Sequence, residues 1–383
     1  MAPARDPHYT LTMHIGIDAR LPTYQMGGIS RYTLHLLSAL AEQDPHNRYT
    51  IFQSRKEQRP FVPAAARWRT RRLWTPCHHR LEPLALGVEL LPYRLDVLHS
   101  PDFIPPAFGA RRRVITVHDL YFLHRPETKS PASRRYYNDQ ITWAVDAADH
   151  IIAVSESTRQ ELVDLLRVPG EKVTTVYHAA NPIYRRPVSA EARARTLARY
   201  SLSPGFTLFV GTLEPRKNIM MLLSAFARMR VDTGYDAPLV LVGNKGWLYD
   251  ELFAEVEALQ LGSSVIHLPG VTDDHLAALY NAAGVLALPS HYEGFGLPVL
   301  EAMHCGCPVI ASNRGALPEV LGDAGLLLPP TDAGAWADGL CRVLSDGDLA
   351  QRLIQAGRKR ASAFTWEKTA TRTLAVYEQA ANA

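Results

Sequence analysis

Two glutamates stand where a strand pattern gives way to a helical pattern. Glu293 lies in a short polar turn after the apolar run 285–288, and Glu301 follows eight residues later, inside the helical pattern. Gly294 and Gly296 leave the backbone bare where that helix begins. A helix start offers unpaired N–H donors and a partial positive charge, which suits a phosphate. Two carboxylates in this setting can hold two parts of one elongated ligand, whereas two unrelated glutamates would be a cap and a solvated surface residue.

A pair of cations follows another strand pattern. Residues 206–210 are apolar, Gly211 comes next, and Arg216 and Lys217 stand just before a helical pattern that begins at residue 219. Guanidinium binds phosphate in a bidentate way and ammonium acts as a point charge, so the pair predicts a phosphate clamp. The alternative is an ordinary pair of surface cations.

The first half of the chain offers a histidine and a glycine pair. His118 follows the apolar run 114–117, at the carboxyl end of a strand, where α/β proteins bind ligands. Gly27 and Gly28 separate the strand pattern 14–18 from a helical pattern at 29–40, although a full G-x-G-x-x-G is missing. The glycine pair is therefore either part of a site or a tight turn.

The elements that must position these residues alternate between strand and helix in two series. This alternation predicts an α/β fold with two doubly wound, Rossmann-like domains facing across a cleft. We place them at 1–195 and 196–365, and a final helix occupies 366–383. Residues 55–95, rich in Arg, Trp and Pro, are expected to form loops and helices, or a lobe that faces the acceptor or a membrane.

Composition indicates an ordinary globular protein. Of 383 residues, 47% are hydrophobic and 21% are charged, and no apolar run reaches the ~18 residues of a spanning helix. The start, Met1 to Thr12, is polar and lacks the apolar core of a signal peptide. Four cysteines form no disulfide framework in a chain of this length, and Cys305-Gly-Cys307 lacks a second pair that would complete a metal site. We expect a cytoplasmic location.

Charge is unevenly spread. Residues 1–185 carry 24 Lys and Arg against 18 Asp and Glu, whereas the remainder carries 17 against 20. A basic half is typical of nucleic-acid binding, of a solvated face, or of association with an anionic membrane. We expect no nucleic-acid partner. We expect instead that the protein binds peripherally to the inner face of the membrane.

The stretch Glu-Gly-Phe-Gly-Leu-Pro-x-x-Glu-Ala-Met, residues 293–303, resembles the signature of the family 4 retaining glycosyltransferases of the GT-B fold. The resemblance implies that Glu293 contacts the donor sugar and that Glu301 holds the ribose hydroxyls. It also implies that the 216–217 pair neutralises the leaving pyrophosphate and that the C-terminal helix crosses back to the first domain. Further residues expected at the catalytic and donor sites by resemblance are His118, Gly27, Gly28, Gly211, Gly294, Phe295, Gly296 and Leu297.

The run Val117–Pro126, VHDLYFLHRP, resembles the mannosyltransferase branch found in polysaccharide gene clusters. This implies GDP-mannose as the donor and a growing glycan or lipid-linked molecule as the acceptor. A UDP-sugar is the alternative donor. His124 and the pair His78-His79 are expected to be structural.

No metal or cofactor is expected. The single Asp-x-Asp spacing, Asp346-Gly347-Asp348, lies between helical segments, where a hinge and N-cap explain it better than a metal site. Arg216 and Lys217 can stabilise the leaving group instead. Retention, through a short-lived ion pair, is implied by the resemblance. Two other classes stay open: an isomerase of the same shape acting on sugars or nucleotides, and a non-catalytic protein that binds carbohydrate or nucleic acid.

Overall fold

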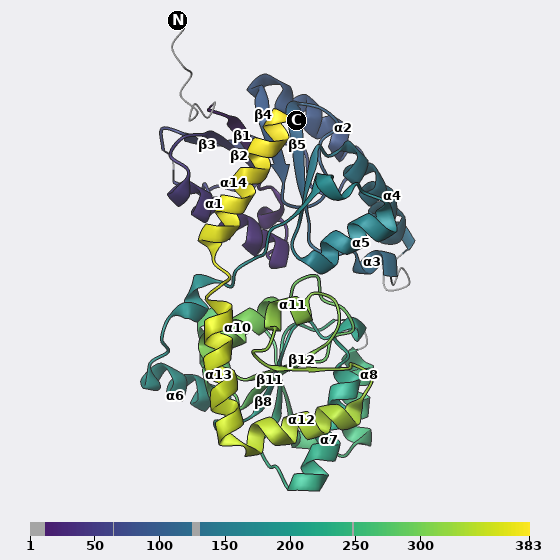
Figure 1. The fold of residues 1–383 in the computed structure, drawn as a ribbon, viewed down its shortest axis with the longest axis vertical. Helices are drawn as coiled ribbons and strands as arrows, with labels where there is room; N and C mark the ends of the chain where they lie inside the picture. The colour runs from purple at the N-terminus through teal and green to yellow at the C-terminus, as the bar shows by residue number, and fades with distance from the viewer. Residues whose placement is uncertain (1–11, 64, 125–130, 247–248) are drawn as a thin grey trace, which may run out of the picture. The chain divides into compact units, whose positions relative to one another are not determined.

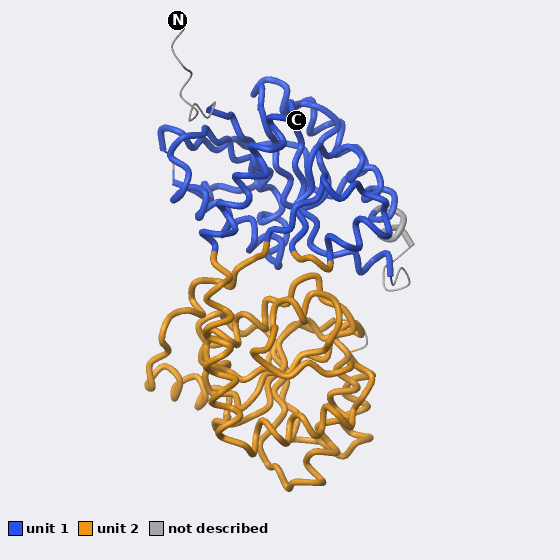
Figure 2. Tube along the Cα trace, in the orientation of Figure 1, with its two compact units in different colours: residues 1–154, 158–176, 366–383 blue, residues 155–157, 177–365 orange. Residues whose placement is uncertain are grey.

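The computed structural model describes residues 12–63, 65–124, 131–246 and 249–383, with backbone alone for 131–136. The polar N-terminal stretch and residues 125–126 of the run after His118 lie outside this description. The chain divides into two compact units (Figure 2). Unit 1 comprises residues 1–154, 158–176 and 366–383, and unit 2 comprises residues 155–157 and 177–365.

Unit 1 is built on a parallel sheet of seven strands (Figure 1). The sheet order is β3-β2-β1-β4-β5-β6-β7, and the strands span β1 His14–Asp18, β2 Arg48–Ser54, β3 Trp68–Leu73, β4 Leu95–Ser100, β5 Ala110–Val117, β6 His150–Ala153 and β7 Val173–Thr175. The central strands are buried apolar runs, as a sheet covered on both faces requires.

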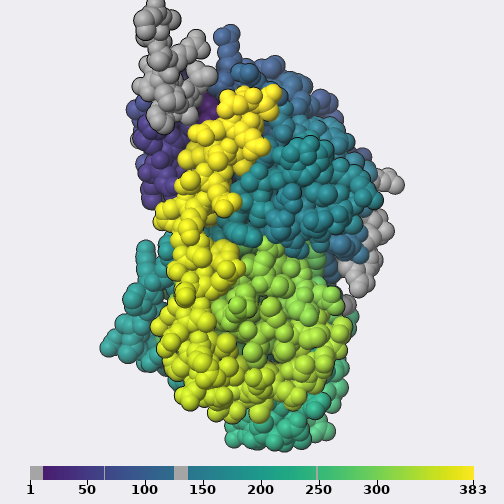
Figure 3. Space-filling view, viewed as in Figure 1, coloured from purple at the N-terminus to yellow at the C-terminus, as the bar shows by residue number. Residues whose placement is uncertain are grey.

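Helices cover both faces of this sheet. They are α1 Gly28–Gln43, α2 Glu82–Leu90, α3 Tyr121–His124, α4 Pro131–Ala147, α5 Glu156–Leu166 and α14 Trp366–Asn382, with short 3-10 turns η1 Leu21–Thr23, η2 Leu91–Tyr93 and η4 Gly170–Lys172. The last helix belongs to unit 1 and lies on its outside (Figure 3). Helix α14 packs on α1. A hydrogen bond also links it to the sheet, since the hydroxyl of Tyr377 lies 2.7 Å from Nδ1 of the buried His99 on β4.

Unit 2 repeats the design with six parallel strands. The order is β10-β9-β8-β11-β12-β13, and the strands span β8 Thr207–Val210, β9 Leu239–Val242, β10 Val265–Leu268, β11 Val285–Leu288, β12 Val309–Ser312 and β13 Leu326–Leu328. The helices are α6 Ala190–Arg199, α7 Ile219–Thr233, α8 Tyr249–Ala258, α9 Asp273–Ala282, α10 Leu297–Cys305, α11 Leu317–Leu321, α12 Ala333–Ser345 and α13 Gly347–Ala361, with 3-10 turns η5 Pro182–Arg185, η6 Pro215–Lys217 and η7 Gly262–Ser264.

The strand order positions the site. In unit 1 the order reverses between β1 and β4, and in unit 2 it reverses between β8 and β11. Loops that leave the carboxyl ends of neighbouring strands diverge at such a switch point and open a crevice for ligands. Gly27 and Gly28 follow β1, whereas Arg216 and Lys217 follow β8 and Glu293 follows β11. The expected doubly wound fold is therefore present in each unit, with the candidate residues beside its switch point.

Several local expectations were wrong. Residues 68–73 form an edge strand, which the arginines of this segment concealed because their side chains face solvent. The hinge and N-cap expected at residues 346–348 are confirmed, in contrast, because the Asp346 side chain accepts a hydrogen bond from the Leu349 amide and caps α13. The boundary between the two compact units falls after Val176 rather than after residue 195, because α6 packs on α9 of unit 2. Within the described part of the chain, no helix has the length and hydropathy needed to span a membrane.

Candidate functional site

The loops after β8 and β11 bring together a carboxylate and two cations in unit 2. Oε1 of Glu293 accepts hydrogen bonds from the Lys217 ammonium at 2.7 Å and from the Ser290 hydroxyl at 2.7 Å. Oε2 lies 3.2 Å from the guanidinium of Arg216. That guanidinium also donates to the Tyr292 carbonyl at 3.1 Å and to Glu214 at 2.7 Å. The sequence predicted both cations and Glu293 at one site, and the structure joins them directly.

Burial makes this cluster strongly electrostatic. Only 6% of Glu293 and 7% of Lys217 is exposed, so Lys217 is not in the exposed loop that its position suggested. Burial raises the pKa of Glu293, but the charges of Lys217 and Arg216 and the hydrogen bonds from Lys217 and Ser290 outweigh it, and the pKa falls below its ordinary value. The cluster therefore holds an ionised carboxylate between two cations, and Glu214 pairs with Arg216 as a second carboxylate.

Helix α10 begins beside this cluster. Its N-cap, Gly296, has a φ of 104° and makes no side-chain cap, and a Cβ there would lie 2.7 Å from the side chain of Leu317. Gly315 faces Glu293 so closely that a Cβ would lie 2.6 Å from the Glu293 carbonyl oxygen. Only glycine fits either position, which brings bare backbone to the site. Pro298 has no N–H, and the Val299 amide donates to the Gly296 carbonyl at 3.0 Å. Of the first three residues of α10, Leu297 therefore offers the amide suited to an anionic group.

Three other residues predicted on the donor side are Glu301, Gly211 and Phe295. Glu301 lies on α10, and its Oε2 accepts a hydrogen bond from Tyr280 at 2.9 Å. Gly211 follows β8 with a φ of 153°, and a Cβ added there would lie 3.4 Å from the side chain of Lys217. Phe295 is buried among aromatic rings, 6.1 Å from that of Tyr177, so its side chain serves the core of unit 2.

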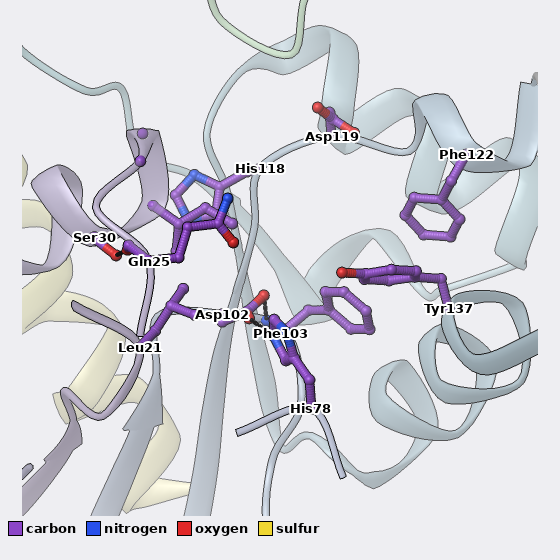
Figure 4. Close-up of a pocket in the computed structure, with 13 residues that line it drawn as sticks. Leu21, Gln25, Ser30, His78, Asp102, Phe103, His118, Asp119, Phe122 and Tyr137 are labelled. Carbon is purple, nitrogen blue, oxygen red and sulfur yellow. Dashed lines mark hydrogen bonds and ion pairs between the residues drawn. The ribbon is translucent and has the colours of Figure 1, made fainter. Parts of the chain in front are cut away.

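Unit 1 carries a separate pocket at its switch point, with a cavity of about 280 Å³ (Figure 4). Small-ligand pockets are commonly ~300–1,000 Å³, so its size suits one small ring. The lining residues come from the loops after β1, β3, β4 and β5 and from α1, α3 and α4. They are Leu21, Gln25, Gly27, Gly28, Ile29, Ser30, His78, Asp102, Phe103, His118, Asp119, Phe122 and Tyr137. Three residues predicted from the sequence, Gly27, Gly28 and His118, thus share one pocket.

His118 is held in one tautomer. Its Nε2 lies 2.9 Å from the carbonyl oxygen of Pro101, which can only accept, so Nε2 carries the proton. Burial lowers the pKa of His118, against the raising effects of that carbonyl and of Asp102 and Asp119, and the ring is neutral near pH 7. Its edge meets the ring of Tyr32, with centroids 5.0 Å apart. His118 is therefore a neutral polar group in the pocket wall.

The structure adds residues that the sequence did not single out. Nε2 of His78 lies 2.6 Å from Oδ2 of Asp102, and this hydrogen bond raises the pKa of His78 above its ordinary value (Figure 4). His78 was expected to be structural, yet it lines the pocket. Two contacts fix the position of His78. Its amide donates to Glu82 at 2.6 Å, and Glu82 in turn accepts a hydrogen bond from the buried Arg20 at 2.6 Å. The sequence carried no signal for His78, because β3 before it was not predicted as a strand, whereas Asp102 is a polar residue that follows β4.

Aromatic rings form one wall of the same pocket. Phe103, Phe122 and Tyr137 lie together on one side of Figure 4, with ring centroids between 5.7 and 6.2 Å apart. Carboxylates stand beside them at Asp102 and Asp119. Aromatic faces with a few convergent polar groups are the usual lining of a small-molecule site.

The described residues hold no group of three or more His, Cys, Asp or Glu side chains placed to share a metal ion. The Asp-x-Asp spacing is accounted for by local structure, since Asp346 caps α13. The described cysteines have no disulfide partner, and burial raises the pKa of Cys305 to about 12.

Comparison with known proteins matches both halves of the chain. The family model "Glycosyl transferases group 1" matches residues 200–360, and "Glycosyltransferase Family 4" matches residues 26–182. The O-antigen chain mannosyltransferase B of Escherichia coli is 33% identical over 93% of this chain and 97% of its own. A D-inositol 3-phosphate glycosyltransferase of Streptomyces bingchenggensis is 34% identical over 74% of this chain and 67% of its own.

Solved structures agree on the fold. Sucrose-phosphate synthase from Thermosynechococcus elongatus matches with a TM-score of 0.76 and 25% identity, over 96% of this chain and 98% of that one. WaaG, a glycosyltransferase of lipopolysaccharide biosynthesis, matches with a TM-score of 0.72 and 16% identity, over 95% of this chain and 99% of that one. Two parallel sheets with interleaved helices are common to them. The chain belongs to the family 4 glycosyltransferases and has the GT-B fold.

Proposed function

We propose that this glycosyltransferase moves mannose from GDP-mannose to a hydroxyl of a growing or lipid-linked glycan, with retention of the α configuration. The observation that carries the proposal is the Glu293–Lys217–Arg216 cluster at the start of α10. The mannose rests on the likeness to a mannosyltransferase that is 33% identical over nearly its whole length, and on the run around His118. Family membership favours a transferase over an isomerase or a non-catalytic binder.

The cluster explains how a leaving nucleoside diphosphate would be stabilised. The diphosphate brings negative charge to two preorganised cations and to the Leu297 amide at the start of α10. Glu293 holds both cations in place before the donor binds, and it would then turn to a hydroxyl of the sugar. Glu301, fixed by Tyr280, would accept hydrogen bonds from the ribose hydroxyls. The role of His118, contact with the donor sugar, rests on the family resemblance.

The reaction then needs little covalent help from the protein. The bond between the anomeric carbon and the diphosphate breaks, the acceptor oxygen bonds to that carbon on the same face, and the acceptor proton passes to the leaving phosphate. Charge builds on the diphosphate in the transition state, where Arg216 and Lys217 stabilise it. In this mechanism the two cations take the place of a metal ion, and no cofactor takes part.

The unit 1 pocket is proposed as the acceptor subsite, next to the donor sugar that His118 would contact. Among the described residues that line it, two are aspartates and none is lysine or arginine. Such a lining disfavours a phosphate and suits the hydroxyls of a neutral sugar ring, with the aromatic wall against its apolar face. One relative is named for D-inositol 3-phosphate, which carries a phosphate, whereas this pocket supports an acceptor without a phosphate.

The test is a panel of nucleotide sugars followed by calorimetry and by turnover with mannose oligosaccharides. GDP-mannose is expected to bind most tightly and to turn over in excess EDTA. Preference for a UDP-sugar would overturn the donor, and loss of activity on chelation, restored by Mn²⁺ or Mg²⁺, would overturn the metal-free mechanism. Binding without transfer to any acceptor would contradict the proposed reaction.

A further inference from the structure

Helix α2 of unit 1 is apolar on two opposite sides, and only one side is packed. Leu86 and Leu90 enter the core with Phe52 of β2. Four other large apolar residues, spaced so that they form one stripe of the helix and its ends, are between 56 and 60% exposed: Leu81, Leu84, Val88 and Leu91. We call these four residues the α2 face. A helix that is apolar all round is normally buried, so an exposed half implies contact with something apolar.

Neighbouring aromatic residues extend the α2 face. Trp74 is 71% exposed, and it lies beside the helix because its amide donates to Glu89 at 2.8 Å. The guanidinium of Arg55 lies 4.0 Å from the centre of the Trp74 ring. Phe108, also exposed, packs over Gly87, where a Cβ would lie 3.0 Å from its ring. Scattered exposed apolar residues need no explanation, but a patch of this kind marks an interaction surface.

The surrounding charge is positive. Residues 67–94 contain six arginines, all exposed: Arg67, Arg69, Arg71, Arg72, Arg80 and Arg94. The same segment contains two acidic residues, of which one is buried and the other is half-buried and bound to backbone amides. Glu82 is buried against Arg20, and Glu89 accepts hydrogen bonds from the backbone amides of Trp74 and Thr75. The solvent-facing charge of the segment is therefore almost purely cationic, with Arg80 and Arg94 at the two ends of the α2 face.

We propose that the α2 face seats unit 1 on an anionic lipid bilayer. Leucines and a tryptophan on one side of a short helix, flanked by arginines, match the chemistry of an interfacial helix, whose apolar side enters the headgroup boundary. Nucleic acid would use the arginines but leave the leucine stripe in water. If two copies of the chain met through this surface, their arginines would lie close together and repel each other. The inference rests on the proposed function in one respect, because a lipid-linked acceptor lies at such a surface.

The test uses the purified full chain and vesicles of phosphatidylcholine, with or without an equal part of phosphatidylglycerol, in sedimentation. The wild type is expected to bind the anionic vesicles, more at low than at high salt, and to bind neutral vesicles weakly. Replacing Leu84 and Val88 together by Glu is expected to lower the bound fraction at least about tenfold. Arg80→Gln is expected to weaken binding about fivefold and to flatten the salt dependence.

Val231→Glu is the matched control, because Val231 is 86% exposed on α7 of unit 2, and it is expected to bind like the wild type. Mannose transfer to a soluble acceptor is measured on every variant, so a fault in the proposed function shows separately from a fault in docking. Unchanged vesicle binding by the Leu84/Val88 variant would overturn the proposal. The proposal would also be overturned if the wild type did not bind anionic vesicles at low salt. A third contradicting result would be a wild-type dimer in sedimentation velocity that dissociates in the Leu84/Val88 variant.

Discussion

The ammonium of Lys217 lies 2.7 Å from the carboxylate of Glu293, although 76 residues separate them in the chain. Both are almost wholly buried, and Arg216 approaches the other carboxylate oxygen at 3.2 Å. The resting site of unit 2 is thus an internal ion cluster. A donor diphosphate would find the cations already desolvated and in place, which is the condition for strong transition-state stabilisation.

Lys217→Ala is expected to lower kcat by ~10²–10³, because it removes a donor from the leaving group. It is also expected to lower the free energy of unfolding by about 3–5 kcal/mol, since Glu293 then keeps a buried charge with a weaker partner. Steady-state kinetics and guanidinium unfolding measure the two effects. Arg228→Ala, which breaks a solvent-exposed pair with Asp232, is the control and should change neither.

The double variant Lys217→Met with Glu293→Gln separates the two effects. Removing both charges should restore most of the lost stability while activity stays low. Wild-type turnover in Lys217→Ala would contradict the phosphate role, and an unchanged unfolding free energy would contradict the buried pair.

The two glutamates are expected to differ in what they control. Glu301→Ala should mainly weaken the affinity for GDP, because its carboxylate is proposed to hold the ribose, whereas Glu293→Ala should mainly lower kcat. Tyr280→Phe removes the hydrogen bond that fixes Glu301 and should share the affinity loss in milder form. Calorimetry with GDP and steady-state kinetics measure the division, and loss of binding alone in both glutamate variants would refute it.

In the proposed acceptor pocket, Asp102→Asn is expected to raise the acceptor KM at least about tenfold and to leave GDP affinity unchanged. The change weakens a charge-assisted hydrogen bond with His78 and removes a carboxylate that would bind sugar hydroxyls. Glu161→Gln is a matched control, since Glu161 pairs with His124 at 3.0 Å and neither residue lines the pocket. Equal KM effects in the two variants would remove Asp102 from acceptor recognition.

Stability is expected to fall on mild acidification. Burial foremost, and the nearby His118, lower the pKa of His99 to about 3, so the folded chain leaves this ring neutral where the unfolded chain protonates it. The free energy of unfolding should therefore drop as pH falls below about 6.5, by about 1.4 kcal/mol between pH 7.5 and 5.5 from His99 alone. Guanidinium unfolding at the two pH values measures it. His99→Gln, which does not titrate, should show a smaller drop, and equal drops would contradict the assignment.

Sequence reasoning found the sheets because their strands are buried on both faces and read as short apolar runs, such as 285–288. It missed β3, Trp68–Leu73, because an edge strand with exposed arginines has no such run. Glycines and charges after strands, together with the family resemblance, made Arg216, Lys217, Glu293 and His118 candidates. The sequence could not show that Glu293 binds the cations, because that contact depends on the β8–β11 pairing across the switch point.

His78 and Asp102 were missed for a related reason. Neither belongs to a motif, and they meet only because Glu82 and Arg20 hold the loop after β3 against the loop after β4. The exposed stripe of α2 was equally hidden, since a run of leucines in sequence does not tell which of them the core covers. Packing decides these points, and packing is set by contacts distant in the chain.

The most direct measurement of the central claim is the product itself. The protein is incubated with GDP-mannose and a mannose oligosaccharide, and the anomeric proton and carbon of the new linkage are read by NMR. The account predicts an added mannose in α linkage. A β-linked product would contradict the retaining mechanism, and an α-linked sugar drawn from a UDP donor instead would contradict the assignment of GDP-mannose.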